Sequence, residues 1–322
     1  MQVIPYNKDY FDKWNQFVLE SDNGNFLFHR NFMEYHSDRF LDASLLLLDE
    51  KGNIQSVIPA NKRENAIYSH QGLTYGGVIM KERKHIREVI RNFYYIMNYY
   101  KQQGIERVVY KPVPNYITQN ICDVEHFIMK MINAELIRVD TSFVTHLYEP
   151  IHLQERRKRS IKKAEKNSDI KISIDNNFTA YWKEILEPNL WERYKAKPVH
   201  SLDEIVLLHQ RFPENILQAN AYIGEKIAAG ITIFIFEHTI HCQYISSTDE
   251  GRNTGALDLL FFRMIENFKS KKKYFSMGTS NNEGNDLNLG VSEFKEGFDA
   301  HIYAHFHYQF SLQHLFNLEK FI

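Results

Sequence analysis

The order in which strands and helices are predicted along the chain repeats once, and this repeat limits the fold more than any other feature of the sequence. Each half contains two apolar strands joined by a short turn, in residues 43–61 and again in residues 219–236. The turns contain Gly52 and Gly224, which suit a tight reversal between strands. In each half a third strand, a long helix, a short strand, a second helix and a last strand follow. Two tandem copies of one domain are therefore expected.

The matching segments have similar lengths in the two halves. The long helices are predicted at 86–104 and 255–273, where apolar residues recur every three or four positions. This order resembles the core of the GNAT acyltransferases, an α+β fold with a mixed, largely antiparallel sheet flanked by helices. Two unrelated α+β domains that share the order are the alternative. The third strand, short strand, second helix and last strand are predicted at 67–77, 105–112, 125–134 and 142–149, and then at 239–248, 273–278, 290–298 and 302–310.

The length of 322 residues also suits two domains, because single domains usually have about 100 to 200 residues. Pro150 ends the first predicted domain, residues 1–150, and the second covers residues 151–322. The second opens with a charged helix at 153–166, and a strand with alternating apolar residues follows it. We expect the first domain to support the fold and form part of an acceptor cleft, and the second to hold the acyl donor.

Composition and charge exclude several classes of protein. A formal net charge of −1 argues against a dedicated DNA-binding protein, although a local patch could still contact tRNA. Cys122 and Cys242 lie far apart, which excludes a disulfide framework and a cysteine-based metal cluster. The first residues lack the basic and apolar regions of a signal peptide, and no stretch approaches the roughly 18 apolar residues of a membrane helix. We therefore expect a soluble, cytoplasmic protein, with peripheral membrane contact left open.

The charged helix at 153–166 carries a strong excess of positive charge. A solvated helix face explains such a run, and so does a cradle for the phosphates of a nucleotide-linked substrate, a CoA pyrophosphate or tRNA. Both interpretations stay open. Its seven basic residues stand against two acidic ones and are Arg156, Arg157, Lys158, Arg159, Lys162, Lys163 and Lys166.

The run RSIKKAEKNSDIKISI resembles a segment of the FemA/FemB/FemX peptidoglycan-bridge transferases, with Asp169 where that segment usually has Gly. The segments YFSMGTSNNEG and EFKEGFDA near the C-terminus resemble further elements of the same family, with Asp299 in place of Gly. The resemblance implies tandem GNAT-like domains and places the charged pattern of the family on Arg159, Lys163 and Lys166. The chain has no segment long enough for the coiled-coil arm of the staphylococcal-type members, so direct use of aminoacyl-tRNA does not follow from the resemblance.

The acyl-donor site is predicted on the third strand of the second half and the turn after it. N-acyl transfer needs a polarised carbonyl, and GNAT folds hold it with backbone N–H groups of a splayed, often bulged strand. The turn GRNTGALDLL enters a helix, whose N-terminus suits a pyrophosphate. Arg252, Thr254 and Gly255 resemble an acetyl-CoA loop, although Leu257 occupies its final small position. Gly255 as a simple helix cap is the alternative. The corresponding turn of the first half has bulky charged residues, so we expect no donor there.

Three residues are candidates for catalysis. Lys295 precedes the Gly297 turn and could stabilise negative charge that develops in the cleft, although an exposed helix lysine is the simpler interpretation. Tyr244 is the candidate proton donor, with a core tyrosine as the alternative, and Asp249 could take a proton from the acceptor amine.

Two further features of the second half carry less weight. The polar loop 279–288 could contact substrate hydroxyls. Histidines recur at every second or fourth position of the last strand, but no carboxylate or cysteine partner stands beside them in the sequence, so we expect no metal site.

The function expected from the sequence is acyl transfer to an amino group of a cell-envelope precursor, such as a peptidoglycan or cell-wall intermediate, or of an amino sugar. Acyl-CoA is slightly favoured as co-substrate, which would make the enzyme an acyltransferase for groups other than aminoacyl groups. Aminoacyl-tRNA is the alternative donor, as in a FemX-like transferase. The acceptor would be a small or nucleotide-linked molecule. A tandem GNAT protein that only binds a ligand is the alternative from outside the enzymes.

Overall fold

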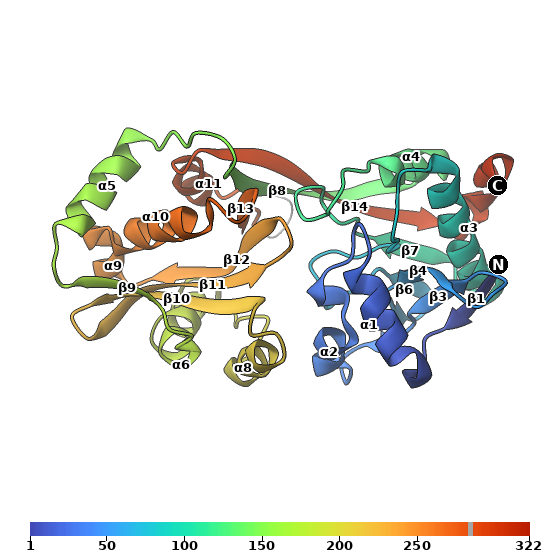
Figure 1. The fold of residues 1–322 in the computed structure, drawn as a ribbon, viewed down its shortest axis with the longest axis horizontal. Coiled ribbons are helices and arrows are strands. Elements are labelled where there is room, and N and C mark those ends of the chain that lie inside the picture. Colours follow the sequence, from blue (N-terminus) through green and yellow to red (C-terminus); the bar gives the residue numbers. More distant parts are fainter. Residues whose placement is uncertain (283–285) are drawn as a thin grey trace. The chain divides into compact units, whose positions relative to one another are not determined.

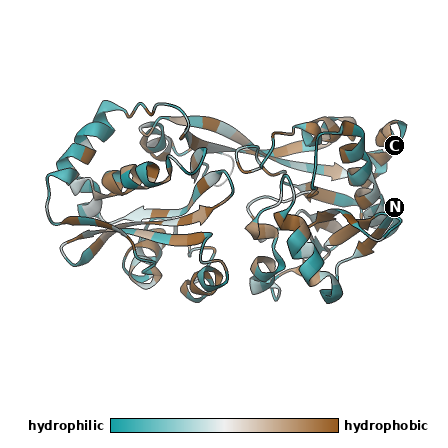
Figure 2. Cartoon of the chain, viewed as in Figure 1, coloured by the Kyte–Doolittle hydropathy of each residue, from teal (hydrophilic) through white to brown (hydrophobic). Residues whose placement is uncertain are grey.

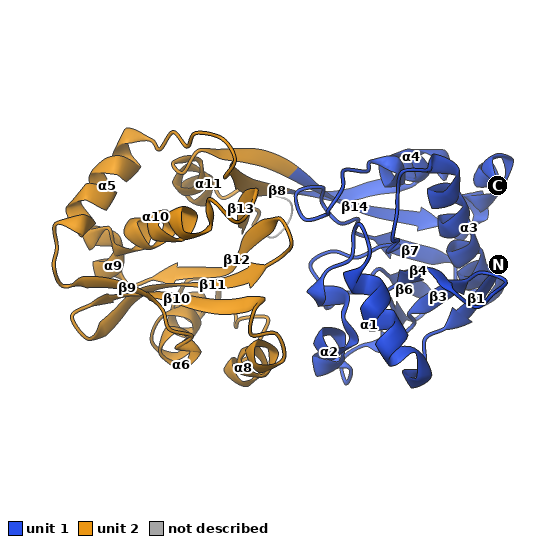
Figure 3. Cartoon of the chain, in the orientation of Figure 1, with its two compact units in different colours: residues 1–140, 304–322 blue, residues 141–303 orange. Residues whose placement is uncertain are grey.

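The computed structural model describes residues 1–282 and 286–322 and divides them into two compact units (Figure 3). The first unit contains residues 1–140 together with 304–322, and the second contains residues 141–303. No helix in these described ranges is both long and apolar enough to cross a bilayer.

The units do not divide at Pro150, where the sequence placed the boundary. Strand β8 (Glu135–His146) begins in the first unit and ends in the second, and β14 (Ala300–Ser311) runs from the second unit back into the first. The last strand of each copy thus belongs in part to the unit of the other copy. An alternating pattern indicates a strand but not the sheet that it joins, so this exchange could not be predicted from the sequence.

The first unit contains a small sheet, β1-β3-β4, and the strands β2-β5-β6-β7-β14 of a larger one (Figure 1). Helix α3 packs on this core, and its Phe93, Ile96 and Met97 lie in a buried cluster with Phe310 of β14. The other elements of this unit, in chain order, are β1 (Gln2–Pro5), α1 (Phe11–Leu19), α2 (Arg30–Met33), β2 (Leu41–Asp42), β3 (Leu45–Leu48), β4 (Ile54–Ile58), β5 (Asn61–Arg63), β6 (Ala66–Tyr68), α3 (Ile86–Gln102), β7 (Arg107–Tyr110) and α4 (Val124–Met131).

The second unit contains the strand order β8-β13-β12-β11-β10-β9, in which only the recorded β12–β13 pairing is parallel among the described residues. Helix α10 lies on one face of these strands, and α6 and α8 lie on the other (Figure 1). The elements are α5 (Glu155–Glu165), β9 (Ile170–Ile174), α6 (Phe178–Tyr181), a π-helical turn (Trp182–Leu186), α7 (Glu187–Tyr194), α8 (Leu202–Arg211), β10 (Ile216–Ile223), β11 (Lys226–Ile235), β12 (Thr239–Ser247), α9 (Asp249–Thr254), α10 (Ala256–Phe268), β13 (Tyr274–Thr279) and α11 (Leu289–Glu296).

The hydropathy of the helices explains where they lie in the second unit. Helix α10 is largely apolar and buries Leu260, Phe261 and Met264 against the sheet, whereas α5 is mostly hydrophilic and exposes one side (Figure 2). Helix α8 begins at a capping box, in which Ser201 Oγ accepts a hydrogen bond from Glu204 N at 3.2 Å and the Glu204 carboxylate accepts one from Ser201 N at 2.8 Å.

The fold class predicted from the sequence is confirmed, because each unit combines a mixed, mostly antiparallel sheet with packed helices. Three details differ. The third strand of the first copy is only β6, after which residues 69–84 form loops and isolated bridges. The glycine-containing turn after β12 is a short helix, α9. The helices α6, α7 and α8 fill a region in which no element was predicted. The predicted polar loop 279–288 lies partly outside the described residues.

Candidate active site

The candidate site lies where β12 and β13 of the second unit diverge. The two parallel strands pair at three positions, residues 239–241 with 274–276, and no further pair between them is recorded for the described residues. On the other side of β12, Tyr244 pairs with Thr232 and Cys242 pairs with Ile233, so Gln243 is an extra, bulged residue. The strand expected to carry the acyl carbonyl is thus both bulged and splayed, as the sequence analysis anticipated.

Lys295 of α11 places its amine at this divergence. The side chain is 4% exposed, and Nζ donates hydrogen bonds to Gly278 O at 3.1 Å and Thr279 O at 2.6 Å, at the end of β13. Gly278 has a positive φ of 69°, a conformation that glycine adopts without strain and that turns the strand end toward the amine. Burial lowers the pKa of Lys295 to about 7. This lysine is therefore a buried cation that titrates near neutrality, and not the exposed helix lysine of the simpler interpretation.

The neighbours of Lys295 on β12 stay neutral near pH 7. Burial and, to a lesser extent, the charge of Lys295 lower the pKa of His241 to about 4, and its Nδ1 lies 3.0 Å from Ser276 Oγ of β13. Burial raises the pKa of the Cys242 thiol well above its usual range. A Cβ at Gly278 would lie 3.6 Å from both Cys242 O and His241 Cε1, so the glycine also keeps the strand ends close. The mobile proton in this group belongs to Lys295.

Tyr244 lies on the other face of the sheet. Its ring meets Trp182 edge-on with centroids 5.2 Å apart, and its hydroxyl accepts a hydrogen bond from His200 N at 3.0 Å and lies 2.7 Å from His200 Nδ1. Lys295 comes from α11, which packs on α10 through Phe294 and Phe261. The structure therefore does not bring Tyr244 and Lys295 to the same face. Proton donation by Tyr244 stays a prediction, and its contacts give it a structural role.

The residues predicted to bind phosphate in the turn after β12 make contacts within the unit. Arg252 donates to Ser247 O at 2.8 Å and pairs with the exposed Asp249, and Thr254 Oγ1 donates to Glu250 O at 2.8 Å. Gly255 has a φ of 84° and ends α9, where a Cβ would lie 2.6 Å from Ser160 O of α5. Gly255 is thus a packed helix junction. Phosphate binding by Arg252 and Thr254, and proton transfer by Asp249, gain no support from these contacts.

The basic helix α5 contains one buried arginine that sequence reasoning did not single out. Arg157 pairs with Asp258 of α10, and its guanidinium lies 4.7 Å from the Phe294 ring centroid and 5.8 Å from that of Phe298. A Cβ at Gly297 would lie 2.8 Å from the Arg157 side chain, which explains a glycine in the EFKEGFDA segment. In a run of seven basic residues nothing local marks the buried one, and the two separate motifs proved to be halves of one contact.

The three basic residues carried over from the resemblance are exposed. Arg159 bonds to the backbone of its own helix, Lys166 caps α5, and Lys163 Nζ donates to Asn253 O of α9 at 2.9 Å. They form a positive surface on α5 rather than part of the buried group around Lys295.

The first unit has a corresponding parallel pair, β6 and β7, which is closed where β12 and β13 diverge. After three pairs, Ser69 N donates to Val109 O at 2.9 Å and Lys111 N donates to Ser69 Oγ at 2.8 Å. Gly76 N then donates to Lys111 O at 2.7 Å, and Lys111 Nζ donates to Leu73 O. Backbone and side chains of residues 69–76 occupy the position that an acyl group would need.

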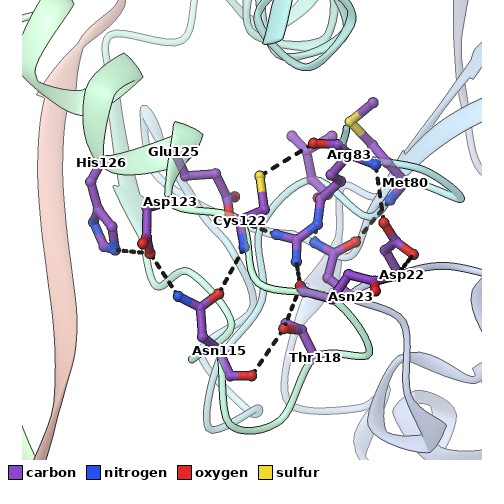
Figure 4. Close-up of polar contacts among 12 residues, drawn as sticks. Asp22, Asn23, Met80, Arg83, Asn115, Thr118, Cys122, Asp123, Glu125 and His126 are labelled. Atoms are coloured by element: carbon purple, nitrogen blue, oxygen red, sulfur yellow. Dashed lines mark hydrogen bonds and ion pairs between the residues drawn. The ribbon is translucent and has the colours of Figure 1, made fainter. Parts of the chain in front are cut away.

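The segment before α3 is also tied into the interior of the first unit (Figure 4). Arg83 is 5% exposed, its N donates to Asp22 Oδ2 at 3.1 Å, and its Nη1 lies 3.6 Å from Glu125 Oε2. Burial raises the pKa of Glu125, which accepts a hydrogen bond from Tyr110. These contacts fill the turn that would hold a donor pyrophosphate, so we keep the donor site in the second unit.

Solved structures share this fold over nearly the whole chain. FemX aligns with a TM-score of 0.68 at 8% identity over 97% of both chains. The C-terminal domain of a putative lysylphosphatidylglycerol synthetase from Agrobacterium fabrum aligns with a TM-score of 0.59 at 10% identity over 98% of this chain and 95% of that one. A tandem GNAT protein from the clavulanic acid biosynthesis pathway aligns with a TM-score of 0.50 at 8% identity over 97% of each chain. No family model and no curated protein matches the sequence. The fold is that of the FemX-like tandem GNAT proteins.

Proposed function

We propose that this chain, with its FemX-like tandem GNAT fold, is an N-acyltransferase that holds the reacting carbonyl where β12 and β13 diverge. The observation that carries the proposal is Lys295, a buried amine at the end of β13 beside the bulged part of β12. Attack by an acceptor amine forms a C–N bond, breaks the bond between the acyl carbon and the donor, and places negative charge on the carbonyl oxygen. Backbone N–H groups and an ammonium at this point would stabilise that charge.

Lys295 suits this role because two of its N–H groups already have partners. The ammonium form has three N–H donors, and two of them bond to Gly278 O and Thr279 O. The third is available to the oxyanion. Because burial lowers the pKa of Lys295 to about 7, the ammonium also gives up a proton easily when the donor leaves as a thiolate or a ribose alkoxide.

The donor that we propose first is acyl-CoA, which would make the protein an acyltransferase for groups other than aminoacyl groups. The proposal rests on the sequence of the turn at Arg252, Thr254 and Gly255, with an acyl acceptor on a cell-envelope precursor or an amino sugar. The acceptor amine would lose its proton to a carboxylate such as Asp249, which is exposed at the start of α9.

Aminoacyl-tRNA is the second candidate donor, and one observation favours it. The exposed basic side chains of α5 form a continuous positive surface, while Arg252 and Thr254 are bonded within their own segment. A polyanion such as tRNA gains more from that surface than the single pyrophosphate of CoA does. FemX and lysylphosphatidylglycerol synthetase are among the proteins that share the fold.

A donor panel tests the proposal. The full chain would be mixed with acyl-CoAs and with charged tRNAs, binding would be followed by native mass spectrometry, and transfer would be followed with amino-sugar and nucleotide-linked acceptors. Transfer from acyl-CoA that charged tRNA leaves unchanged supports the first donor, and transfer from charged tRNA alone supports the second. Binding with no transfer from any donor would favour a protein that only binds its ligand. Tyr244→Phe should retain transfer if its role is structural.

A further inference from the structure

Three potential metal ligands meet in the first unit, from strands far apart in the sequence. Asp140 lies on β8, and His305 and His307 lie on β14. One carboxylate oxygen and one ring nitrogen of each histidine lie within 4.8 Å of one another. Asp140 is 6% exposed and His305 is 4% exposed. The sequence placed the histidines on one strand but offered no carboxylate beside them, and the fold supplies it.

His305 points a buried nitrogen with no protein partner at this group. Its Nε2 has no hydrogen-bond partner among the described residues, and the imidazole rings of His305 and His307 lie 4.8 Å apart between centroids. A buried ring nitrogen normally finds a partner, because it otherwise loses its hydrogen bond to water without replacement. Burial lowers the pKa of His305 to about 3, so the ring is neutral and its lone pair is available to a ligand.

The other two groups are also arranged for coordination. His307 Nε2 lies 3.2 Å from Asp140 Oδ2, a pair that shares one proton, while Arg138 Nε donates to Asp140 Oδ1 at 2.7 Å. Arg138 thus fixes the carboxylate with Oδ2 toward the histidines, as outer groups do around metal ligands. Lys111 is the other cation nearby, and burial lowers its pKa to about 8, so it can lose its charge beside a metal ion.

We propose that Asp140, His305 and His307 bind a divalent transition-metal ion of the zinc type. Two imidazoles and one carboxylate are a ligand set that zinc and cobalt accept, and a water molecule or an anion would complete the coordination. The metal replaces the proton shared by His307 and Asp140, so one proton is released to solvent on binding. The ion clips β8 to β14 within the first unit. This proposal does not depend on acyl transfer at Lys295.

The test uses the full chain after treatment with a chelator, titrated with Co²⁺ as a spectroscopic probe and with Zn²⁺ by calorimetry. We expect one ion per chain and visible d–d absorption from Co²⁺. His305→Gln and His307→Gln should each weaken binding at least about 100-fold, because each removes a ligand rather than an outer group. The matched control is His301→Gln, a histidine of the same strand whose ring stacks on His146 at 3.9 Å in the second unit. It should bind like the parent protein.

Absence of d–d absorption in the parent protein overturns the proposal, and so does a loss of binding in His301→Gln with retention in His305→Gln. The second result would assign the ion to the exposed group formed by His146, Glu149 and His301. If the ligand variants fail to fold, zinc X-ray absorption on the parent protein decides. Two imidazole ligands at about 2.0 to 2.1 Å support the site, and fewer than two overturn it.

Discussion

The two units contain the same parallel strand pair but end it differently. In each, three residues of one strand pair with three of the next, 66–68 with 107–109 and 239–241 with 274–276. In the first unit, residues 69–76 then close the gap, and Lys111 bonds to a carbonyl of that segment. In the second, the strands diverge and Lys295 bonds to the end of β13.

The comparison teaches that a duplicated fold can keep its framework in both copies and a reactive opening in one. Both lysines are buried, and burial lowers both pKa values, to about 8 for Lys111 and about 7 for Lys295. What separates them is the neighbouring backbone, which fills one gap and leaves the other bulged and unpaired at Gln243. A perturbed lysine therefore indicates a reaction site only together with the space beside it.

The largest expected effect concerns the buried arginines, because each unit has one. Arg157→Met should lower the free energy of unfolding by about 3 to 5 kcal/mol, since it leaves Asp258 buried without its partner. Glu125→Gln in the first unit should cost only about 1 kcal/mol, because Arg83 Nη1 lies 3.6 Å away and a neutral amide can keep the Tyr110 contact. Urea unfolding followed by circular dichroism measures both. Equal losses would show that the two arginines do equivalent work.

The second effect is catalytic. Lys295→Met should reduce turnover by about 10² to 10³, the usual loss when a donor to the oxyanion is removed. Lys111→Met is the matched control, a buried lysine in the closed copy, and should retain turnover within about twofold. Initial rates with the donor identified by the panel measure both. A loss of similar size in Lys111→Met would remove the distinction between an open and a closed copy.

The third effect is a pH dependence of stability that Lys295 alone should provide. Its pKa is about 7 in the folded chain and near its ordinary value of 10.5 when unfolded. Between these values the unfolded state binds the extra proton, so the free energy of unfolding rises with pH, by at most about 1.4 kcal/mol per unit. From pH 7 to 9 the parent should gain about 2 kcal/mol relative to Lys295→Met. Urea titrations at several pH values give this difference. Parallel profiles for the two proteins would place the lysine in solvent.

The framework could be predicted from the sequence because it depends on local periodicity. Apolar residues at helical spacing indicated α3 and α10, and alternation from Ile170 to Ile174 indicated β9. The helix α9 was read as a turn, because Gly255 belongs equally well to a helix end.

The candidate site was less predictable because its geometry depends on a bulge. Ile240 and Cys242 lie in the cluster under α10, and regular alternation would put Tyr244 with them. The extra residue Gln243 reverses the alternation, so Tyr244 meets Trp182 on the other face. Arg157 was hidden among similar residues, and Asp140 stands too far in sequence from His305 for spacing to connect them. Long-range pairing decided each case.

The smallest effect compares two glycines with positive φ, Gly104 after α3 in the first unit and Gly255 before α10 in the second, at 74° and 84°. Gly104→Ala should cost roughly 1 kcal/mol, because a Cβ there meets open space and only the left-handed backbone is strained. Gly255→Ala should cost about 1 kcal/mol more, because its Cβ would lie 2.6 Å from Ser160 O and α5 must shift. Thermal and urea unfolding of the two variants give the difference. If both variants lose the same amount, α5 is free to move away from the α9–α10 junction, and the basic surface that it carries is not held beside the site by packing at Gly255.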